Sequence, residues 1–273
     1  MSSTANVAPV IVGIDGSKAA IDAALWAVDE ALDRDVPLRL VHVIGGSRPA
    51  SASGESNDLD VEYGETSLRA ASSAVIASGR PVKVETDLLW GSVDDTLISE
   101  SESASMLCVG SVGIGWIAER ILGSTAAAVS EGAHCPVVVV RSHSGAPSGK
   151  SDGWIVVGVD DRPANDQLVT RALDEGRVRH APVLAVATWS SALTGVSFDE
   201  LDHHVETWRQ RYPDVHIRPA ATGGGLPEFL VGCRKDVQLA VVSAADAGKV
   251  PQIIGPHGKP LVPYGECSVM VVH

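Results

Sequence analysis

The chain has 273 residues, of which 45% are hydrophobic and only 4% aromatic, enough for two domains of roughly 100–150 residues each. Its formal net charge of -13 disfavours nucleic acid and anionic membranes as partners, because both are bound through clustered Lys and Arg. No apolar run approaches the roughly 20 residues that span a bilayer, and the opening MSSTANVAP does not resemble a signal peptide. We therefore expect a cytoplasmic protein.

Strands and helices alternate along the first half of the chain. Short apolar runs predict strands at residues 10–14, 38–44, 82–89, 106–109 and 136–140. Apolar residues at helical spacing predict helices ending near Asp33 and over residues 65–78, 92–103 and 124–132. The polar stretch 45–60 has almost nothing to bury, so we expect a mobile excursion after the second strand. Such alternation predicts a parallel sheet with helices on both faces.

The second half of the chain repeats the first. Residues 10–43 align without a gap on 155–188, residues 106–113 on 239–246, and residues 134–140 on 266–272. Such a tandem duplication predicts two α/β domains, each a doubly wound five-stranded parallel sheet flanked by helices. Small, polar, turn-rich residues lie between the copies. The expected domains are residues 1–143 and 154–273, joined by a linker at 144–153.

The cysteines Cys108, Cys135, Cys233 and Cys267 are scattered, and none forms a CxxC pair. Such cysteines are typical of small buried side chains in a reducing compartment. We expect no metal site from them.

A glycine-rich stretch, VGSVGIGWIAERILGST, begins at the end of the predicted strand 106–109. Ligands of open parallel sheets gather at the carboxyl ends of strands, where helix N-termini offer unpaired amides. Gly110 and Gly113 can take positive φ and admit a ligand to the backbone, while Ser124 and Thr125 open the next helix. This arrangement predicts a site for an anion such as a phosphate chain.

Three patterns compete for that phosphate. GAPSGKS, residues 145–151, is one residue short of a Walker loop and leads into a strand. GIGWIA, residues 113–118, fits a loose dinucleotide fingerprint, but the next strand does not end in an acidic residue. The third pattern is Gly110, two residues, Gly113, nine residues, then Gly123 and Ser124, and it fits best.

This third spacing, together with IVGIDGS at the first strand and AHCPVVVV at the last, resembles the ATP-binding branch of the universal stress protein family, in its tandem-domain bacterial type. The resemblance covers nearly the whole chain. It implies an adenine nucleotide alpha hydrolase-like fold, ATP with or without Mg²⁺, and a regulatory role in stress or dormancy. It also implies a homodimer and an unidentified regulatory protein partner.

The resemblance assigns roles to individual residues. Asp15 would meet the nucleoside, since a carboxylate accepts hydrogen bonds from ribose hydroxyls or the adenine amine. Val43 would hold adenine through its main chain. The residues that would surround the ribose and phosphates are Gly110, Gly113, Gly123, Ser124 and Thr125. The alternative is that the glycines only make turns and Asp15 caps the helix that begins near Lys18.

The second copy departs from this pattern. Asp160 is kept, but Ser243 and Asp246 replace Gly110 and Gly113, and GPHGK at residues 255–259 replaces the Gly-Ser-Thr sequence. A carboxylate directed at phosphates is repulsive. We expect a second site that is degenerate or built for another ligand.

Chemical catalysis would need a base, a nucleophile or a metal cluster beside the phosphates. Surface or structural roles account for His134, Cys135 and residues 202–204, and helix capping accounts for the carboxylates of residues 93–95. Arg120 could reach a phosphate or face water. We therefore expect no catalytic residue and a nucleotide that acts as a ligand. A slow nucleotide hydrolase or transferase stays open as the alternative, as does AMP or cyclic AMP in place of ATP.

Overall fold

The structure is a computed structural model of the chain. It describes residues 7–46, 55–113, 122–141, 153–163, 165–188, 197–233, 236–254 and 267–273. The chain divides into two compact units, Met1–Ser148 and Gly149–Val272. The predicted linker lies outside the described residues except for Gly153.

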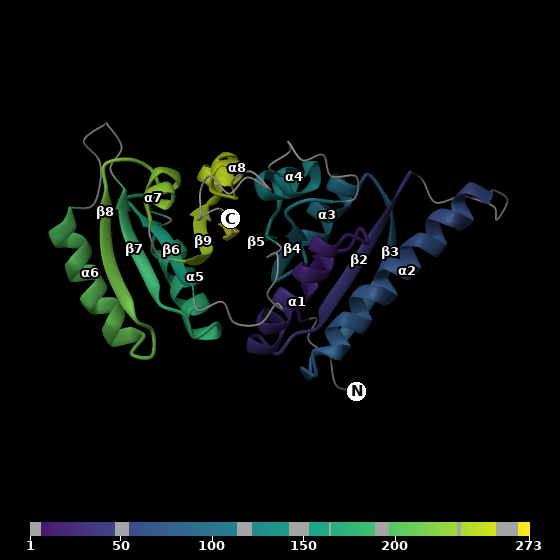
Figure 1. The fold of residues 1–273 in the computed structure, drawn as a ribbon, viewed down its shortest axis with the longest axis horizontal. Helices are drawn as coiled ribbons and strands as arrows, with labels where there is room; N and C mark the ends of the chain where they lie inside the picture. Colours follow the sequence, from purple (N-terminus) through teal and green to yellow (C-terminus); the bar gives the residue numbers. More distant parts are fainter. Residues whose placement is uncertain are drawn as a thin grey trace. The chain divides into compact units, whose positions relative to one another are not determined.

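The first unit is a five-stranded parallel sheet with helices on both faces (Figure 1). Its strands are β1 Val10–Gly13, β2 Leu38–Gly45, β3 Val84–Gly91, β4 Met106–Gly110 and β5 Val137–Val140. Its helices are α1 Lys18–Asp33, α2 Glu55–Ala77, α3 Val93–Ser101 and α4 Ser124–Gly132. The strand order is β3-β2-β1-β4-β5, and each of these neighbouring pairs is parallel.

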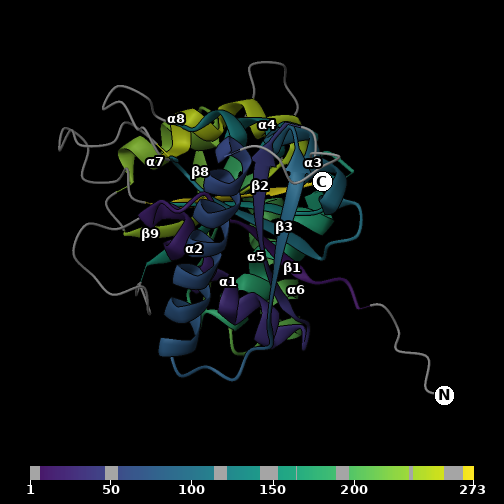
Figure 2. The same ribbon diagram turned by 90° about the vertical axis from the view of Figure 1, so that its right-hand side faces the viewer.

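The apolar runs predicted as strands form the core of this sheet. All four residues of β5 are buried, as are Met106 to Val109 of β4, because helices cover both faces of a doubly wound parallel sheet. Helices α1 and α2 pack against each other on one face, and α3 packs against α4 on the other. Figure 2 shows α2 running along β2 and β3, which it contacts. The predicted fold class is confirmed.

Helix α2 begins at Glu55, ten residues before the predicted start, so the expected excursion over residues 45–60 is wrong for its last six residues. The pattern of apolar residues did not reveal this end of the helix because it buries little apolar surface: Leu59 is 66% exposed. Asp58 and Asp60 carry carboxylates near the start of the helix, where the helix dipole favours negative charge. Residues 47–54 lie outside the described part.

The order of the strands places a topological switch point between β1 and β4. From β1 the chain builds outward through β2 to β3, then returns to β4 on the other side of β1. Ligand sites of doubly wound sheets lie outside the carboxyl ends of the strands at such a point. The ends of β1, at Gly13, and of β4, at Gly110, therefore mark where a site is expected.

The second unit repeats this topology (Figure 1). Its strands are β6 Trp154–Val159, β7 Val183–Thr188, β8 Ile217–Thr222, β9 Val237–Ser243 and β10 Ser268–Val272, in the parallel order β10-β9-β6-β7-β8. Its helices are α5 Asn165–Val178, α6 Phe198–Arg211, α7 Leu226–Gly232, α8 Val250–Ile254 and the 3-10 helix η1 Ala244–Lys249. Across the described residues, no helix is long and apolar enough to cross a membrane.

Candidate functional site

A cavity of about 390 Å³ opens at the switch point of the first unit, within the roughly 300–1,000 Å³ typical of small-molecule sites. It is formed by the ends of β1, β2 and β4 and by the first residues of α4, with Val93 and Leu97 of α3 on one side. The residues selected from the sequence all line it: Asp15, Val43, Gly110, Gly113, Gly123, Ser124 and Thr125. The fold brings these seven together, and their binding roles stay predictions.

Asp15 lies in the turn between β1 and α1. Its Oδ1 accepts a hydrogen bond from the Ser17 amide at 2.9 Å. Ser17 itself caps α1, accepting the Ala20 amide on its hydroxyl at 3.1 Å. Between them Gly16 has a φ of 90°, a conformation that glycine adopts without strain. Asp15 therefore does not cap the helix directly, and its carboxylate is held by the turn.

Gly110 and Gly113 allow close approach of neighbouring atoms, and neither residue uses the left-handed conformation that glycine can adopt. A Cβ on Gly110 would stand 2.7 Å from the carbonyl carbon of Ala19, which brings β4 close against α1. A Cβ on Gly113 would stand 2.6 Å from Oδ2 of Asp15. The missing side chain of Gly113 therefore makes room for the Asp15 carboxylate.

Helix α4 directs its N-terminus at the cavity. Its N-cap is Gly123, which supplies no side-chain hydrogen bond, and helix geometry leaves the first amides without intrahelical partners. The Gly123 amide donates to the carbonyl of Ser111 at 2.9 Å, tying the helix start to the end of β4. Ser124 and Thr125 add hydroxyls to these amides, and the first turn carries no acidic residue. An anion is favoured at such a helix end.

Val43 presents its main chain to the same cavity. The Val41 carbonyl accepts the Ile14 amide at 2.8 Å on the side of β2 that faces β1. Backbone groups of a strand alternate sides residue by residue, so those of Val43 also face that side. Because β1 ends at Gly13, the main-chain groups of Val43 lie beyond the last residue of β1. A main-chain donor and acceptor there suit the edge of a planar base.

Two residues of this region were missed by the sequence analysis. His42 is buried, lines the cavity, and lies 2.7 Å through Nδ1 from the carbonyl of Ile14. Tyr63 of α2 donates its hydroxyl to the Asp15 carbonyl at 2.9 Å. Neither belongs to a glycine motif, and Tyr63 is 48 residues from Asp15, so only the tertiary structure reveals this contact.

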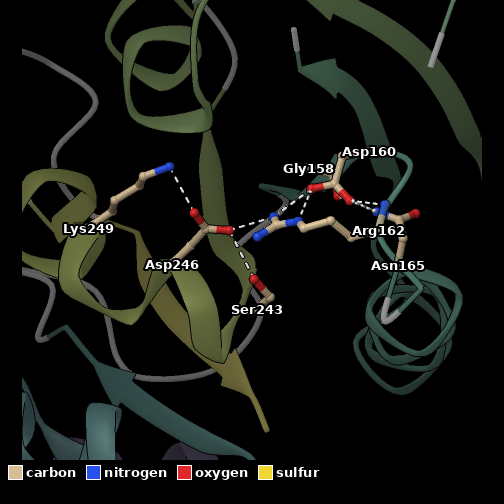
Figure 3. A network of polar contacts seen from close by, with 7 residues as sticks. All are labelled: Gly158, Asp160, Arg162, Asn165, Ser243, Asp246 and Lys249. Atoms are coloured by element: carbon tan, nitrogen blue, oxygen red, sulfur yellow. Dashed lines mark hydrogen bonds and ion pairs between the residues drawn. The ribbon is translucent and has the colours of Figure 1, made fainter. Parts of the chain in front are cut away.

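The matching place in the second unit is filled by charged side chains (Figure 3). Arg162 lies between Asp160, at 2.6 Å from its Nε, and Asp246, at 2.7 Å from an Nη. Lys249 contacts the other oxygen of Asp246 at 2.8 Å, and the Ser243 hydroxyl donates to Asp246 at 2.9 Å. The hollow among them measures only about 60 Å³. We call Asp160, Arg162, Ser243, Asp246 and Lys249 the charge network.

The charge network alters the acidity of Asp246. Burial alone would raise the pKa of this carboxyl, but hydrogen bonds from Lys249, Arg162 and Ser243 outweigh it and lower the pKa to about 2. The Arg162 guanidinium, hydrogen-bonded to Asp160, has a raised pKa. The predicted repulsive carboxylate is thus present, neutralised by the protein's own cations.

The other residues considered as catalytic or metal-binding candidates have structural explanations or lie outside the described part of the chain. All four cysteines are buried thiols, and burial raises the pKa of Cys135 to about 12, so that thiol stays protonated at neutral pH. Asp94 and Asp95 lie in the first turn of α3, as expected. No group of three or more His, Cys, Asp or Glu side chains that could hold a metal occurs within the described ranges. Arg120, GIGWIA beyond Gly113, and GAPSGKS lie outside them.

Comparisons with known proteins agree with the fold and with the family that the sequence resembles. Residues 7–141 match the universal stress protein family. A universal stress protein of Mycobacterium tuberculosis is 46% identical over 263 residues, which cover 96% of this chain and 95% of the relative. Another from the same organism is 38% identical over 266 residues, covering 96% and 95%. The chain therefore belongs to the universal stress protein family.

A solved structure supports the fold along the whole chain. The crystal structure of a universal stress protein from Archaeoglobus fulgidus superposes with a TM-score of 0.69, covering 97% of this chain and 95% of that one. Its sequence identity is 13%, so this likeness concerns the fold alone.

Proposed function

We propose that this universal stress protein binds ATP in the first unit and that the nucleotide acts as a regulatory ligand in a stress or dormancy response. The observation that carries the proposal is the cavity itself, which combines the uncapped N-terminus of α4 with the anchored carboxylate of Asp15. In this assignment the amides and hydroxyls of Ser124 and Thr125 bind the phosphates, and Asp15 accepts hydrogen bonds from ribose hydroxyls. The main chain of Val43 forms hydrogen bonds with the adenine base.

The glycines complete the assignment. Gly110 and Gly123 leave the backbone open at the ribose and phosphate end, and Gly113 leaves room for Asp15. Mg²⁺, where it accompanies ATP, would be held mainly by phosphate oxygens, as is usual for this ion.

A ligand role is favoured over turnover by the ionisable groups of the cavity. Among its described lining residues, only Asp15 and His42 have carboxyl or imidazole side chains, the usual acid–base groups of enzymes. The main chain holds both, Asp15 through the Ser17 amide and His42 through the Ile14 carbonyl. A general base that activates water must have a free acceptor atom directed at the water molecule. These main-chain contacts orient the two side chains for a different purpose, which favours a ligand role. We further propose a cytoplasmic homodimer with a regulatory protein partner; the buried thiols fit a reducing compartment.

The test begins with protein purified without added nucleotide, whose released ligand is identified by mass spectrometry. The protein is then titrated calorimetrically with ATP, AMP and cyclic AMP. We expect about one ATP per chain, and Asp15→Asn should weaken binding about tenfold or more, since hydrogen bonds to a charged acceptor are worth roughly 1.5–3 kcal/mol. The matched control is Asp160→Asn in the second unit, which should leave the stoichiometry and affinity unchanged.

Two results would contradict the proposal. Binding of two equal ligands per chain would show that the second unit also binds nucleotide. Steady phosphate release at several turnovers per second, lost in Asp15→Asn together with binding, would replace the ligand role with that of a hydrolase, since typical enzymes turn over about 1–10³ times per second.

A further inference from the structure

Tyr63 joins α2 to the turn that carries Asp15. Its hydroxyl donates to the Asp15 carbonyl at 2.9 Å, and its ring packs edge-on against His42, with 5.9 Å between ring centroids. The side chain is nevertheless 47% exposed. Tyr63 therefore contributes little to the core, and its hydroxyl makes a specific contact with the proposed site.

The sequence around Tyr63 allows α2 to reach this turn. A Cβ on Gly64 would stand 2.6 Å from Leu88 and 2.7 Å from His42, so glycine lets the helix lie close to β2 and β3. Gly16, in the turn itself, also makes room for this approach, because a Cβ there would overlap the Tyr63 hydroxyl. Two glycines thus create the space in which the tyrosine meets the turn.

Three hydrogen bonds hold the segment that carries Asp15, one of them on the carboxylate and two on main-chain carbonyls. The Ser17 amide holds Oδ1, Tyr63 holds the Asp15 carbonyl, and Nδ1 of His42 donates to the carbonyl of Ile14. The turn between these points includes Gly16, whose backbone is the most permissive of any residue. Without the bond from α2, this turn would sample more conformations, and the carboxylate would be less well placed.

We propose that Tyr63 is a positioning residue of the nucleotide site: by holding the Asp15 main chain from α2, it directs the Asp15 carboxylate towards the ribose. This inference rests on the proposed function.

The test is Tyr63→Phe, which removes the hydroxyl and keeps the ring against His42. Loss of one neutral hydrogen bond that places a ligand group should weaken ATP binding about three- to tenfold. The matched control is Tyr212→Phe in the second unit, whose hydroxyl bonds to Asp174 at 3.3 Å. It should leave ATP affinity unchanged. Melting curves of both variants without nucleotide establish that each is folded.

Two further measurements separate positioning from general loosening. Wild-type protein should prefer ATP to 2′-deoxy- or 3′-deoxy-ATP, and Tyr63→Phe should shrink that preference, because the contact to the missing hydroxyl is already impaired. In nucleotide-free protein, the Ser17 amide should exchange hydrogen faster in Tyr63→Phe than in the wild type.

Equal weakening for all three nucleotides, unchanged affinity, or unchanged exchange at Ser17 would each overturn the positioning role while leaving the proposed function standing. If the wild-type protein binds no adenine nucleotide, the proposed function fails, and the inference fails with it.

Discussion

Gly110, Gly113 and Gly123 share one glycine pattern, but a side chain at each would meet a different neighbour. At Gly110 it would meet the backbone of Ala19 at 2.7 Å, and at Gly113 the Asp15 carboxylate at 2.6 Å. At Gly123 the nearest atom is the Ser111 oxygen at 3.6 Å, an ordinary contact distance. The three glycines therefore serve helix packing, placement of the carboxylate, and access to the amides of α4, respectively.

Gly113→Ala should weaken nucleotide binding about tenfold or more, because Asp15 must rotate away from the added methyl group. Gly123→Ala should change the affinity less than about threefold, since its methyl group has room. Calorimetry of the two variants, with Gly223→Ala in the second unit as a control whose Cβ would meet nothing within 4 Å, checks the difference. Equal losses at Gly113 and Gly123 would show that the glycines act only through access to the backbone.

At the scale of elements, the two units differ in the segment that comes after their fourth strand. In the first unit β4 leads through Ser111 to Gly113 at the cavity, whereas β9 leads directly into η1, which carries Asp246 and Lys249. The carboxylate of Asp246, at the position of Gly113, draws in Arg162, at the position of Ser17. The charge network thereby occupies the space that is open in the first unit.

The charge network makes the second unit sensitive to acid. The folded-state pKa of Asp246 is about 2, below its ordinary value of 3.8, so this carboxylate stabilises the fold fully above that ordinary value. The contribution is lost as the pH falls through about 2. Asp246→Asn should therefore show a shallower loss of stability between these two pH values than the wild type.

Acid unfolding monitored by circular dichroism measures this slope, with Asp202→Asn, an exposed position on α6, as the control. A slope identical in wild type and Asp246→Asn would show that the network leaves the carboxyl group unperturbed.

At the scale of the whole molecule, one fold is used twice with two different outcomes. Both units have the same strand order around their first strand, yet their cavities measure about 390 and about 60 Å³. A duplicated domain therefore need not duplicate its site. The difference predicts that a nucleotide stabilises only one of the two units.

ATP at a hundredfold excess over its dissociation constant should stabilise the first unit by about 2.7 kcal/mol. Native-state hydrogen exchange at buried amides checks this, with Val138 reporting on the first unit and Val241 on the second. We expect slower exchange at Val138 and little change at Val241. Equal slowing at both would mean that the units open together or that both bind ligand, and titration stoichiometry distinguishes these two cases.

Much of the fold is encoded in local patterns. Buried parallel strands such as β4 and β5 require continuous apolar runs, and these runs mark them in the sequence. The start of α2 could not be found in this way, because a solvated helix end has no apolar period. Strand β3 begins at Val84 rather than Val82. The prediction was two residues off because this edge strand buries less apolar surface than the others, so its start is less clearly marked in the sequence.

The sequence by itself determined the α/β class, the repeat and the family, since each is encoded in the order and spacing of nearby residues. It also selected seven residues that the fold gathers around one cavity. Only the tertiary structure decided why Gly113 is glycine, that Tyr63 reaches Asp15, and that Arg162 meets Asp246 across 84 residues of chain. These contacts depend on distances between elements that are far apart in sequence, and packing alone sets those distances.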